Sequence, residues 1–540
     1  MSTNSTMEHL PDLMGPKLRY LAGFTLLSKE SAIVAIGLWV TYLVCGIIYR
    51  LCFSPLASIP GPKLAAMTTW YEAYYDIWLG GQYVWKIEKL HKKYGPVIRI
   101  NPHEIHVSDP DFIDDIYTGT TRKTDKYRFT GRRTQTAMSM VATVPHDIHK
   151  RRRGAMSSYF SKSGVRLLEP IIQRSLEKLL ARMENASKTG EIMEMIYVFK
   201  AATNDIITDY AFGKPSGFMD RDDYNTGFFQ DIEKIFLISH TLMHVGWLGP
   251  LLESLPRWIT TILAPGMDGL YVMQDGWSKQ IEDIKSSSDK DAGKNTIFHG
   301  LLNSKLPDSE KETPRLVHEA QLTVFAGQDT TASTMAATIF ELLANPDKLK
   351  KLKEELTIAI PDPKILPSYA QVEHLPYLSA VIQECLRCHP GVITRMARVS
   401  PEIPVIYNRN ELKYTMPPGT PMSMTSTIIH SDPKYFPNPR KFEPERWLEN
   451  HRLDKYLLAF SRGSRNCLGI NLTYQEMHTF IAGVFRRYDL YDGTGTQKGP
   501  TFELFETTRE RDVDMYADMI VPFPVPGRRG VRIAVRTVHN

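Results

Sequence analysis

The longest uncharged hydrophobic run of the chain lies near its beginning, at Ala32–Tyr49. A helix of this length just spans the hydrocarbon core of a bilayer, so the run predicts a transmembrane anchor after an N-terminal tail of residues 1–31. A cleaved signal peptide is the alternative, although its apolar part would be shorter and nearer the first residue. Two prolines within residues 59–63 forbid helix, so residues 50–62 are interpreted as a stiff hinge.

Beyond the hinge, the apolar positions predict one large, mainly α-helical domain with a small β part, over residues 63–540. Residues 96–109 alternate apolar and polar side chains about an Asn-Pro turn and predict a β-hairpin. Strand-like runs return at residues 412–414 and 531–535. Most of the remaining chain has a helical period without an internal repeat.

The longest predicted helix covers residues 314–344, with Thr313 as its N-cap and an Asn-Pro pair at its end. At about 46 Å it is long enough to cross the domain. Its middle, residues 326–331, contains glycine, aspartate and threonine, which lower helix propensity and compete for backbone hydrogen bonds. Such a local conflict is typical of a functional site.

A second predicted helix, residues 377–388, places Glu384 and Arg387 one turn apart. Taken alone, such a pair is more often a surface ion pair. Arg446, in the segment 442–447, offers a second arginine that would complete a buried network with Glu384.

Composition and charge exclude several classes of protein. The 540 residues are 42% hydrophobic and 23% charged, which is typical of a globular chain. A net charge of +5 is weaker than the concentrated basic face of a nucleic-acid-binding protein. The five cysteines are few and odd in number, so they indicate no disulfide framework and fit a reducing compartment. Basic residues flank the anchor on both sides, and their distribution slightly disfavours a cytosolic C-terminus. Charge alone therefore leaves the orientation of the anchor open.

The most distinctive local pattern surrounds Cys467, in the segment 460–469, which precedes a helix-like run at residues 471–487. Backbone N–H groups at a helix N-terminus favour a thiolate, the form of cysteine that binds metals. Gly463 and Gly469 would let this loop approach a flat macrocycle closely. The alternative for a lone cysteine is a buried, inert side chain.

Phe460-x-x-Gly463-x-Arg465-x-Cys467-x-Gly469 resembles the haem-binding signature of the cytochrome P450 family at every fixed position. Three further family patterns follow its usual order: Ala326-Gly327-x-Asp329-Thr330-Thr331, Glu384-x-x-Arg387 and Pro444-Glu445-Arg446-Trp447. With the anchor and hinge, the resemblance covers essentially the whole chain and is closest to fungal members. It implies a cytochrome P450 fold preceded by one transmembrane helix.

The resemblance also implies a cofactor, haem b, and roles for individual residues around it. Cys467 would be the axial ligand of the iron, Phe460 would pack against its sulfur, and Gly463 and Gly469 would shape the loop. The remaining cofactor-binding residues would hold the haem propionates: Arg465, Arg398, Arg153 and His149, the last in place of the family's tryptophan.

Two further groups take their roles from the same resemblance. Asp329 and Thr330 match the family's acid-alcohol pair, which supplies protons during dioxygen activation; a polar patch that stabilises a helix kink is the alternative. Glu384, Arg387 and Arg446 match a structural triad that retains the haem. The basic run at residues 150–153 would dock an acidic flavin reductase, although such a run is more often a solvated face.

Substrate-facing parts follow by analogy, and they indicate a small lipophilic substrate. They are residues 118–144, 228–265, 322–326, 392–394 and 512–523, with the apolar side chains Met138, Met140, Phe228, Phe236, Met243 and Trp247. An apolar stripe is also typical of ordinary core.

The expected activity is insertion of one oxygen atom from O2 into that substrate, with electrons from NADPH through a cytochrome reductase. The substrate would be a fungal secondary metabolite such as a terpenoid or polyketide intermediate. A haem-thiolate isomerase or dehydratase and a non-catalytic haem sensor are the alternatives. The resemblance favours a single-pass anchor in the endoplasmic reticulum membrane, with the catalytic domain cytosolic.

Overall fold

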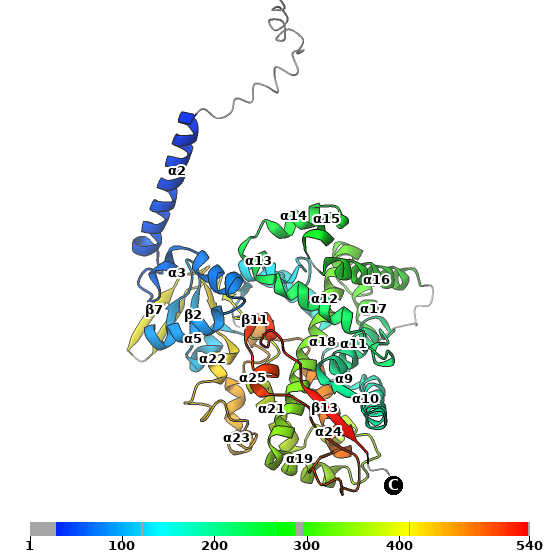
Figure 1. Cartoon of the computed structure of the whole chain (residues 1–540). Helices are drawn as coiled ribbons and strands as arrows, with labels where there is room; N and C mark the ends of the chain where they lie inside the picture. Colours follow the sequence, from blue (N-terminus) through cyan, green and yellow to red (C-terminus); the bar gives the residue numbers. More distant parts are fainter. Residues whose placement is uncertain (1–28, 120–121, 265, 288–294, 410, 538–540) are drawn as a thin grey trace, which may run out of the picture.

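The computed structural model describes residues 29–537, apart from 120–121, 265, 288–294 and 410. Helix α2 (Lys29–Ile48) projects from the globular part, and the preceding tail up to residue 28 lies outside the described residues (Figure 1). The helix continues as the π-helical turn η1 (Tyr49–Phe53), and Glu30–Phe53 is the one continuous helix among the described residues that is long and apolar enough to cross a membrane.

The apolar helix therefore ends at Phe53, later than the predicted end at Tyr49, and the segment expected to be a hinge begins inside it. The Arg50 guanidinium donates a hydrogen bond to the Met67 carbonyl oxygen (2.5 Å), and Arg99 donates to the Arg50 carbonyl oxygen (2.7 Å). Because the charge of Arg50 is accommodated against the globular part, it does not end the helix.

Helices make up most of the globular part, as predicted. The longer ones are α5 (Tyr83–Tyr94), α8 (His146–Met156), α10 (Glu169–Thr189), α11 (Met195–Phe212), α12 (Thr226–Leu237), α16 (Met267–Ser286), α18 (Thr313–Ala344), α19 (Pro346–Ala359), α21 (Pro376–Cys388) and α24 (Ile470–Arg487). Short ones include α3 (Lys63–Met67), α4 (Trp70–Ala73), η2 (Tyr74–Trp78), α13 (Ser239–His244), α14 (Leu248–Ser254), α15 (Arg257–Leu263), α22 (Ser426–His430), α23 (Glu445–Glu449), η8 (Gly463–Arg465) and α25 (Arg509–Asp512).

Helix α18 is the 32-residue helix that the sequence predicted, within one residue at its start. It passes through the middle of the helical part and packs against α11, α16, α21 and α24 (Figure 1). Its buried side chains belong to the main hydrophobic core. In its middle, Gln328, Asp329 and Thr331 are therefore held inside the protein.

The strands form two small sheets and two hairpins. One sheet has the order β1 (Val97–Arg99), β2 (Ile105–Val107), β8 (Pro421–Ser423), β5 (Arg398–Val399), β3 (Asp125–Lys126); the other has the order β4 (Ile192–Glu194), β13 (Arg532–Arg536), β10 (Thr501–Leu504), β9 (Asp489–Leu490). The hairpins are β6 (Val405–Arg409) with β7 (Leu412–Met416), and β11 (Ala517–Met519) with β12 (Val521–Phe523). The hairpin predicted over residues 96–109 is confirmed, with Ile98 opposite His106.

Candidate functional site

Cys467 lies in the loop between η8 and α24, two residues before the helix N-cap Gly469. Its backbone N–H donates to the Phe460 carbonyl oxygen (2.8 Å), which closes the loop over η8. Gly463 has a φ of +75°, and a Cβ there would lie 2.2 Å from the Thr118 carbonyl oxygen, so only glycine fits. The backbone of the adjacent residues Tyr117 and Thr118 therefore requires a glycine at position 463. The sequence analysis had instead explained this glycine by the close approach of a macrocycle.

The Cys467 thiol is open to solvent on one side, although protein atoms surround it on the others. Burial raises its pKa above the ordinary value, against the opposing effects of the Gly469 N–H and Arg153. The backbone N–H at the helix start thus favours the thiolate, as expected, but burial outweighs it. Coordination by a metal ion deprotonates a thiol outright, so the sulfur suits a metal ligand better than a free nucleophile.

Cationic side chains gather around this loop, and each donates only to neutral oxygen atoms. Arg153 of α8 binds the carbonyl and side-chain oxygens of Asn466 (2.8 and 2.6 Å). Arg465 donates to the carbonyl oxygens of Thr124, Thr143 and Val144 (2.7–2.9 Å). Arg398 donates to the Arg465 carbonyl oxygen (3.3 Å). Burial and Arg398 lower the pKa of Arg465 to about 10.

Two more basic side chains belong to this cluster. His149 is buried one helical turn before Arg153, and burial together with Arg465 lowers its pKa to about 3. Lys126 lies opposite Arg398 in the β3–β5 register, and burial together with Arg398 lowers its pKa to about 7. The sequence analysis missed Lys126, because only the pairing of two distant two-residue strands brings it here.

We call the basic side chains Lys126, His149, Arg153, Arg398 and Arg465 the cation cluster, although the lowered pKa of His149 leaves that imidazole neutral at neutral pH. Among the described residues none of the five forms an ion pair with a carboxylate within 4.0 Å, and a buried charge without a partner is costly. The cluster therefore fits a ligand that carries carboxylate groups and lies beside the Cys467 sulfur. The two propionates of haem b meet that description.

The middle of α18 adjoins the same loop. Thr331 Oγ1 lies 3.2 Å from Thr473 Oγ1, about one turn into the helix that follows Cys467. Ala326 is exposed and Thr330 is only half-buried, although the rest of this helix is mostly core. The Thr330 hydroxyl donates to the Ala326 carbonyl oxygen (3.0 Å), which satisfies it within the helix.

Asp329 is buried and held by an ion pair that the sequence analysis did not anticipate. Its carboxylate lies 2.8 Å from Lys200 Nζ of α11 and accepts from the Gln328 amide (3.0 Å). Lys200 also contacts Glu233 of α12 (3.2 Å), which pairs with Arg528 (2.5 Å). Burial alone would lower the pKa of Lys200, but Asp329 and Glu233 raise it above its ordinary value.

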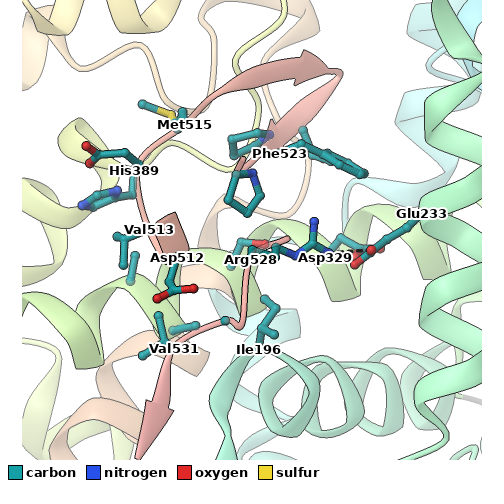
Figure 2. A pocket seen from close by; sticks show the side chains of 18 of the residues that line it. Ile196, Glu233, Asp329, His389, Asp512, Val513, Met515, Phe523, Arg528 and Val531 are labelled. Carbon is teal, nitrogen blue, oxygen red and sulfur yellow. Dashed lines mark hydrogen bonds and ion pairs between the residues drawn. The ribbon is translucent and has the colours of Figure 1, made fainter. Parts of the chain in front are cut away.

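A cavity of about 100 Å³ opens beside this chain of charges. Figure 2 shows Asp329, Glu233 and Arg528 on one side of it and His389 and Asp512 on the other. Its volume suffices for on the order of three water molecules. The Asp329 carboxylate therefore borders a mostly apolar cavity on the side of the C-terminal segment.

Glu384 is completely buried at the centre of a hydrogen-bond network. It accepts from Arg387 (2.7 and 2.8 Å), Arg446 (3.1 Å), the Trp447 indole (2.9 Å) and the Glu443 backbone N–H (2.9 Å). The pair Glu384–Arg387 is therefore not a surface ion pair, and Arg446 completes the network as the sequence indicated.

The apolar side chains expected to face substrate differ in their exposure. Met140 and Met243 are buried, and the Met243 sulfur accepts from Arg133 (2.8 Å). Trp247 is 67% exposed at the surface. Phe236 is the member of that set that lines the cavity of Figure 2.

The four residues of the basic run 150–153 differ in their contacts and exposure. Arg152 forms an ion pair with Glu310 (2.7 Å) and Arg153 belongs to the cation cluster, so Lys150 and Arg151 alone remain exposed.

Comparison with known proteins agrees with this architecture. The model of the family "Cytochrome P450" matches residues 34–511. The chain is 41% identical to cytochrome P450 monooxygenase tpcC of Cochliobolus heterostrophus, over 94% of this chain and 99% of that protein. It is 40% identical to cytochrome P450 monooxygenase astB of Talaromyces wortmannii, over 93% and 97%. It is 37% identical to tryptophan 6-hydroxylase fscE of Fusarium equiseti, over 91% and 94%.

The chain therefore belongs to the cytochrome P450 family. Within that family it is a haem-thiolate monooxygenase, an oxidoreductase whose haem is bound through an axial cysteine.

Proposed function

We propose that Cys467 is the axial cysteine and that the cation cluster binds the propionates of haem b. The observation that carries this assignment is the group of buried and half-buried basic side chains around the Cys467 loop, which form no ion pair with a carboxylate among the described residues. Phe460 lies against the loop, where its ring contacts Tyr474 at 5.5 Å between centroids, while Gly463 and Gly469 set the course of the backbone. The hydrogen-bond network of Glu384, Arg387 and Arg446 stabilises the fold around the haem site.

Haem with a thiolate ligand supplies the reductive activation of dioxygen when it is bound. Asp329 and Thr330 supply the protons that this chemistry requires. The Asp329 carboxylate exchanges protons with water in the cavity of Figure 2, and Lys200 holds it in place. The Thr330 hydroxyl, on the accessible face of α18, would donate and accept protons on the side where haem would bind.

The substrate is a small lipophilic compound into which one oxygen atom is inserted. The relatives named above come from fungi, and two of them are named monooxygenases while the third is named a tryptophan 6-hydroxylase. Their fungal origin supports a fungal secondary metabolite as substrate, such as a terpenoid or polyketide intermediate. Electrons come from NADPH through a cytochrome reductase, which docks at the exposed Lys150 and Arg151.

The domain organisation follows from the same proposal. Residues 63–540 form the catalytic domain, and Glu30–Phe53 anchors it as a single span in the endoplasmic reticulum membrane, with the catalytic domain in the cytosol.

The test is the absorption spectrum of the reduced, carbon monoxide-treated protein. The wild type should show the red-shifted thiolate band, Cys467→Ser should lose it, and the control Cys52→Ser, at an exposed position near the anchor, should keep it. Retention of the band in Cys467→Ser would remove Cys467 from its role. Lys126→Met should release haem more readily, whereas Lys123→Met, at an exposed neighbour paired with Glu402, should not.

The substrate class is tested by titrating the Soret band with terpenoids, polyketide aromatics, fatty acids and sterols. A low-to-high-spin shift with one class, followed by NADPH consumption coupled to an oxygenated product, supports the proposal. Product formation without NADPH would instead indicate an isomerase or dehydratase.

A further inference from the structure

Two helix segments, remote from the Cys467 loop in sequence, face each other with matching side chains. The first segment, α4 with η2, carries Glu72 and Asp76 one turn apart. The second, α13, carries His240 and His244 one turn apart. Residues four apart share one helix face, and the two segments pack together. Two carboxylates therefore meet two imidazoles inside the protein.

The four side chains are at most 2% exposed. Asp76 Oδ2 lies 3.3 Å from His240 Nδ1 and 3.3 Å from His244 Nε2, and Glu72 Oε1 lies 4.0 Å from His244 Nε2. In a tetrahedral zinc site with bonds near 2.0–2.1 Å, ligand atoms are about 3.3 Å apart. The separations around Asp76 are thus those between ligands of one metal ion, and they are long for charge-assisted hydrogen bonds.

His240 gives a second, independent indication. Its Nε2 forms a hydrogen bond with the Asp518 carbonyl oxygen of β11, and because a carbonyl can only accept, Nε2 carries the proton. The buried Nδ1 makes no hydrogen bond of good geometry and lies 3.3 Å from Asp76 Oδ2. A ligating histidine typically donates its other ring N–H to a backbone carbonyl in this way, which aims the free nitrogen at the metal.

The charged side chains around this group are compatible with a bound cation. Arg395 pairs with Glu72 and Glu104, and Arg133 faces Asp76. The three carboxylates exceed these two guanidinium groups by one negative charge, which a protonated imidazole or a bound cation balances. Glu72, Asp76 and His244 each offer a ligand atom within 4.8 Å of the other two, so they are the principal ligands, although Glu72 also pairs with Arg395. His240 adjoins this group through Asp76.

We propose that Glu72, Asp76, His240 and His244 bind a divalent transition-metal ion, with zinc the best match to a set of imidazole and carboxylate ligands. These residues belong to the segment that follows the membrane anchor and to the helices of residues 228–265. Through His240 the ion is also linked to the hairpin β11–β12, where Asp518 donates its N–H to the Gly81 carbonyl oxygen (3.0 Å). The metal joins three segments that are distant in sequence.

Binding of the ion restrains the segments expected to surround the substrate, so zinc slows substrate binding and release without reaching Cys467. This second effect rests on the proposed function, whereas the metal site does not.

The experiment uses the full-length, haem-loaded protein in detergent, because haem occupies the Cys467 thiol, which would otherwise bind zinc itself. After treatment with a chelator, zinc binding is measured by competition with a chromophoric chelator. X-ray absorption at the zinc edge identifies the ligands. We expect one zinc ion per chain with nitrogen and oxygen ligands, and binding weakened by about 100-fold or more in His244→Gln. The control His374→Gln removes a histidine that is 81% exposed and should bind as the wild type does.

Each outcome decides the question. Equal zinc affinity in the wild type and His244→Gln, or sulfur ligands in the absorption spectrum, would overturn the site. If His244→Gln does not fold, as loss of the ferrous carbon monoxide band would reveal, His240→Gln replaces it with the same expectations. A wild type that binds no zinc but shows the thiolate band would refute the metal site and leave the proposed function intact.

Discussion

Lys200 offers the sharpest test of how the central helix is held. Its ammonium group lies 2.8 Å from the Asp329 carboxylate and 3.2 Å from that of Glu233. The side chains of Lys200 and Asp329 are 5% and 6% exposed, so little water screens their interaction. Glu233 keeps a second cation, Arg528, at 2.5 Å, but Asp329 has no other ion pair among the described residues.

Replacing Lys200 with methionine preserves most of the side-chain volume and removes the charge. The Asp329 carboxylate is then buried with the Gln328 amide as its remaining side-chain partner. Breaking a buried ion pair from one side costs about 3–5 kcal/mol. We expect Lys200→Met to be destabilised by that amount, and the double variant Lys200→Met/Asp329→Asn to recover part of it because neither charge remains.

The assay is the urea midpoint for loss of the ferrous carbon monoxide band in the haem-loaded protein. Lys178→Met is the matched control, because Lys178 pairs with Asp220 at 2.7 Å but the two side chains are 42% and 62% exposed. That variant should lose at most about 1 kcal/mol. Equal midpoints for Lys200→Met and Lys178→Met would refute the inference that the buried pair holds Asp329 in place.

Three further predictions concern protons, acid stability and the membrane. Thr330→Ala should retain haem but divert reducing equivalents to peroxide, measured as peroxide formed per NADPH consumed; unchanged coupling would contradict the role of its hydroxyl. His430 is buried with both ring nitrogens hydrogen-bonded, and burial lowers its pKa to about 3, so the unfolded chain takes up a proton first as pH falls below about 6.5. This group should therefore lower the free energy of unfolding by up to about 1.4 kcal/mol per pH unit as pH falls from 6.5 to 3. Urea titrations should show that the free energy of unfolding of His430→Gln falls less steeply over this range. Equal pH dependence in the variant and the wild type would contradict the prediction. Deleting residues 1–53 should release much of the protein into the soluble fraction of a flotation assay, with residual binding through exposed apolar side chains such as Trp247 and Trp258; a deletion variant that stays fully membrane-bound would exclude Glu30–Phe53 as the main anchor.

Local signals determined much of this protein in advance. The apolar run near the N-terminus, the helix of residues 314–344, the hairpin of residues 96–109 and the Cys467 loop were all predictable, because each depends on the order of neighbouring residues. The same holds for the family, whose motifs are short and lie in a constant order.

Only the tertiary structure decided which charges meet. Lys126 joins Arg398 through a strand register, Lys200 reaches Asp329 from another helix, Glu310 draws Arg152 away from the basic run, and α13 brings two histidines to Asp76. No local pattern predicts such pairs, since a buried charge selects its partner from whatever the packing of distant segments places within a few ångströms. The sequence thus determined where the chemistry lies, and the packing determined which side chains hold it in place.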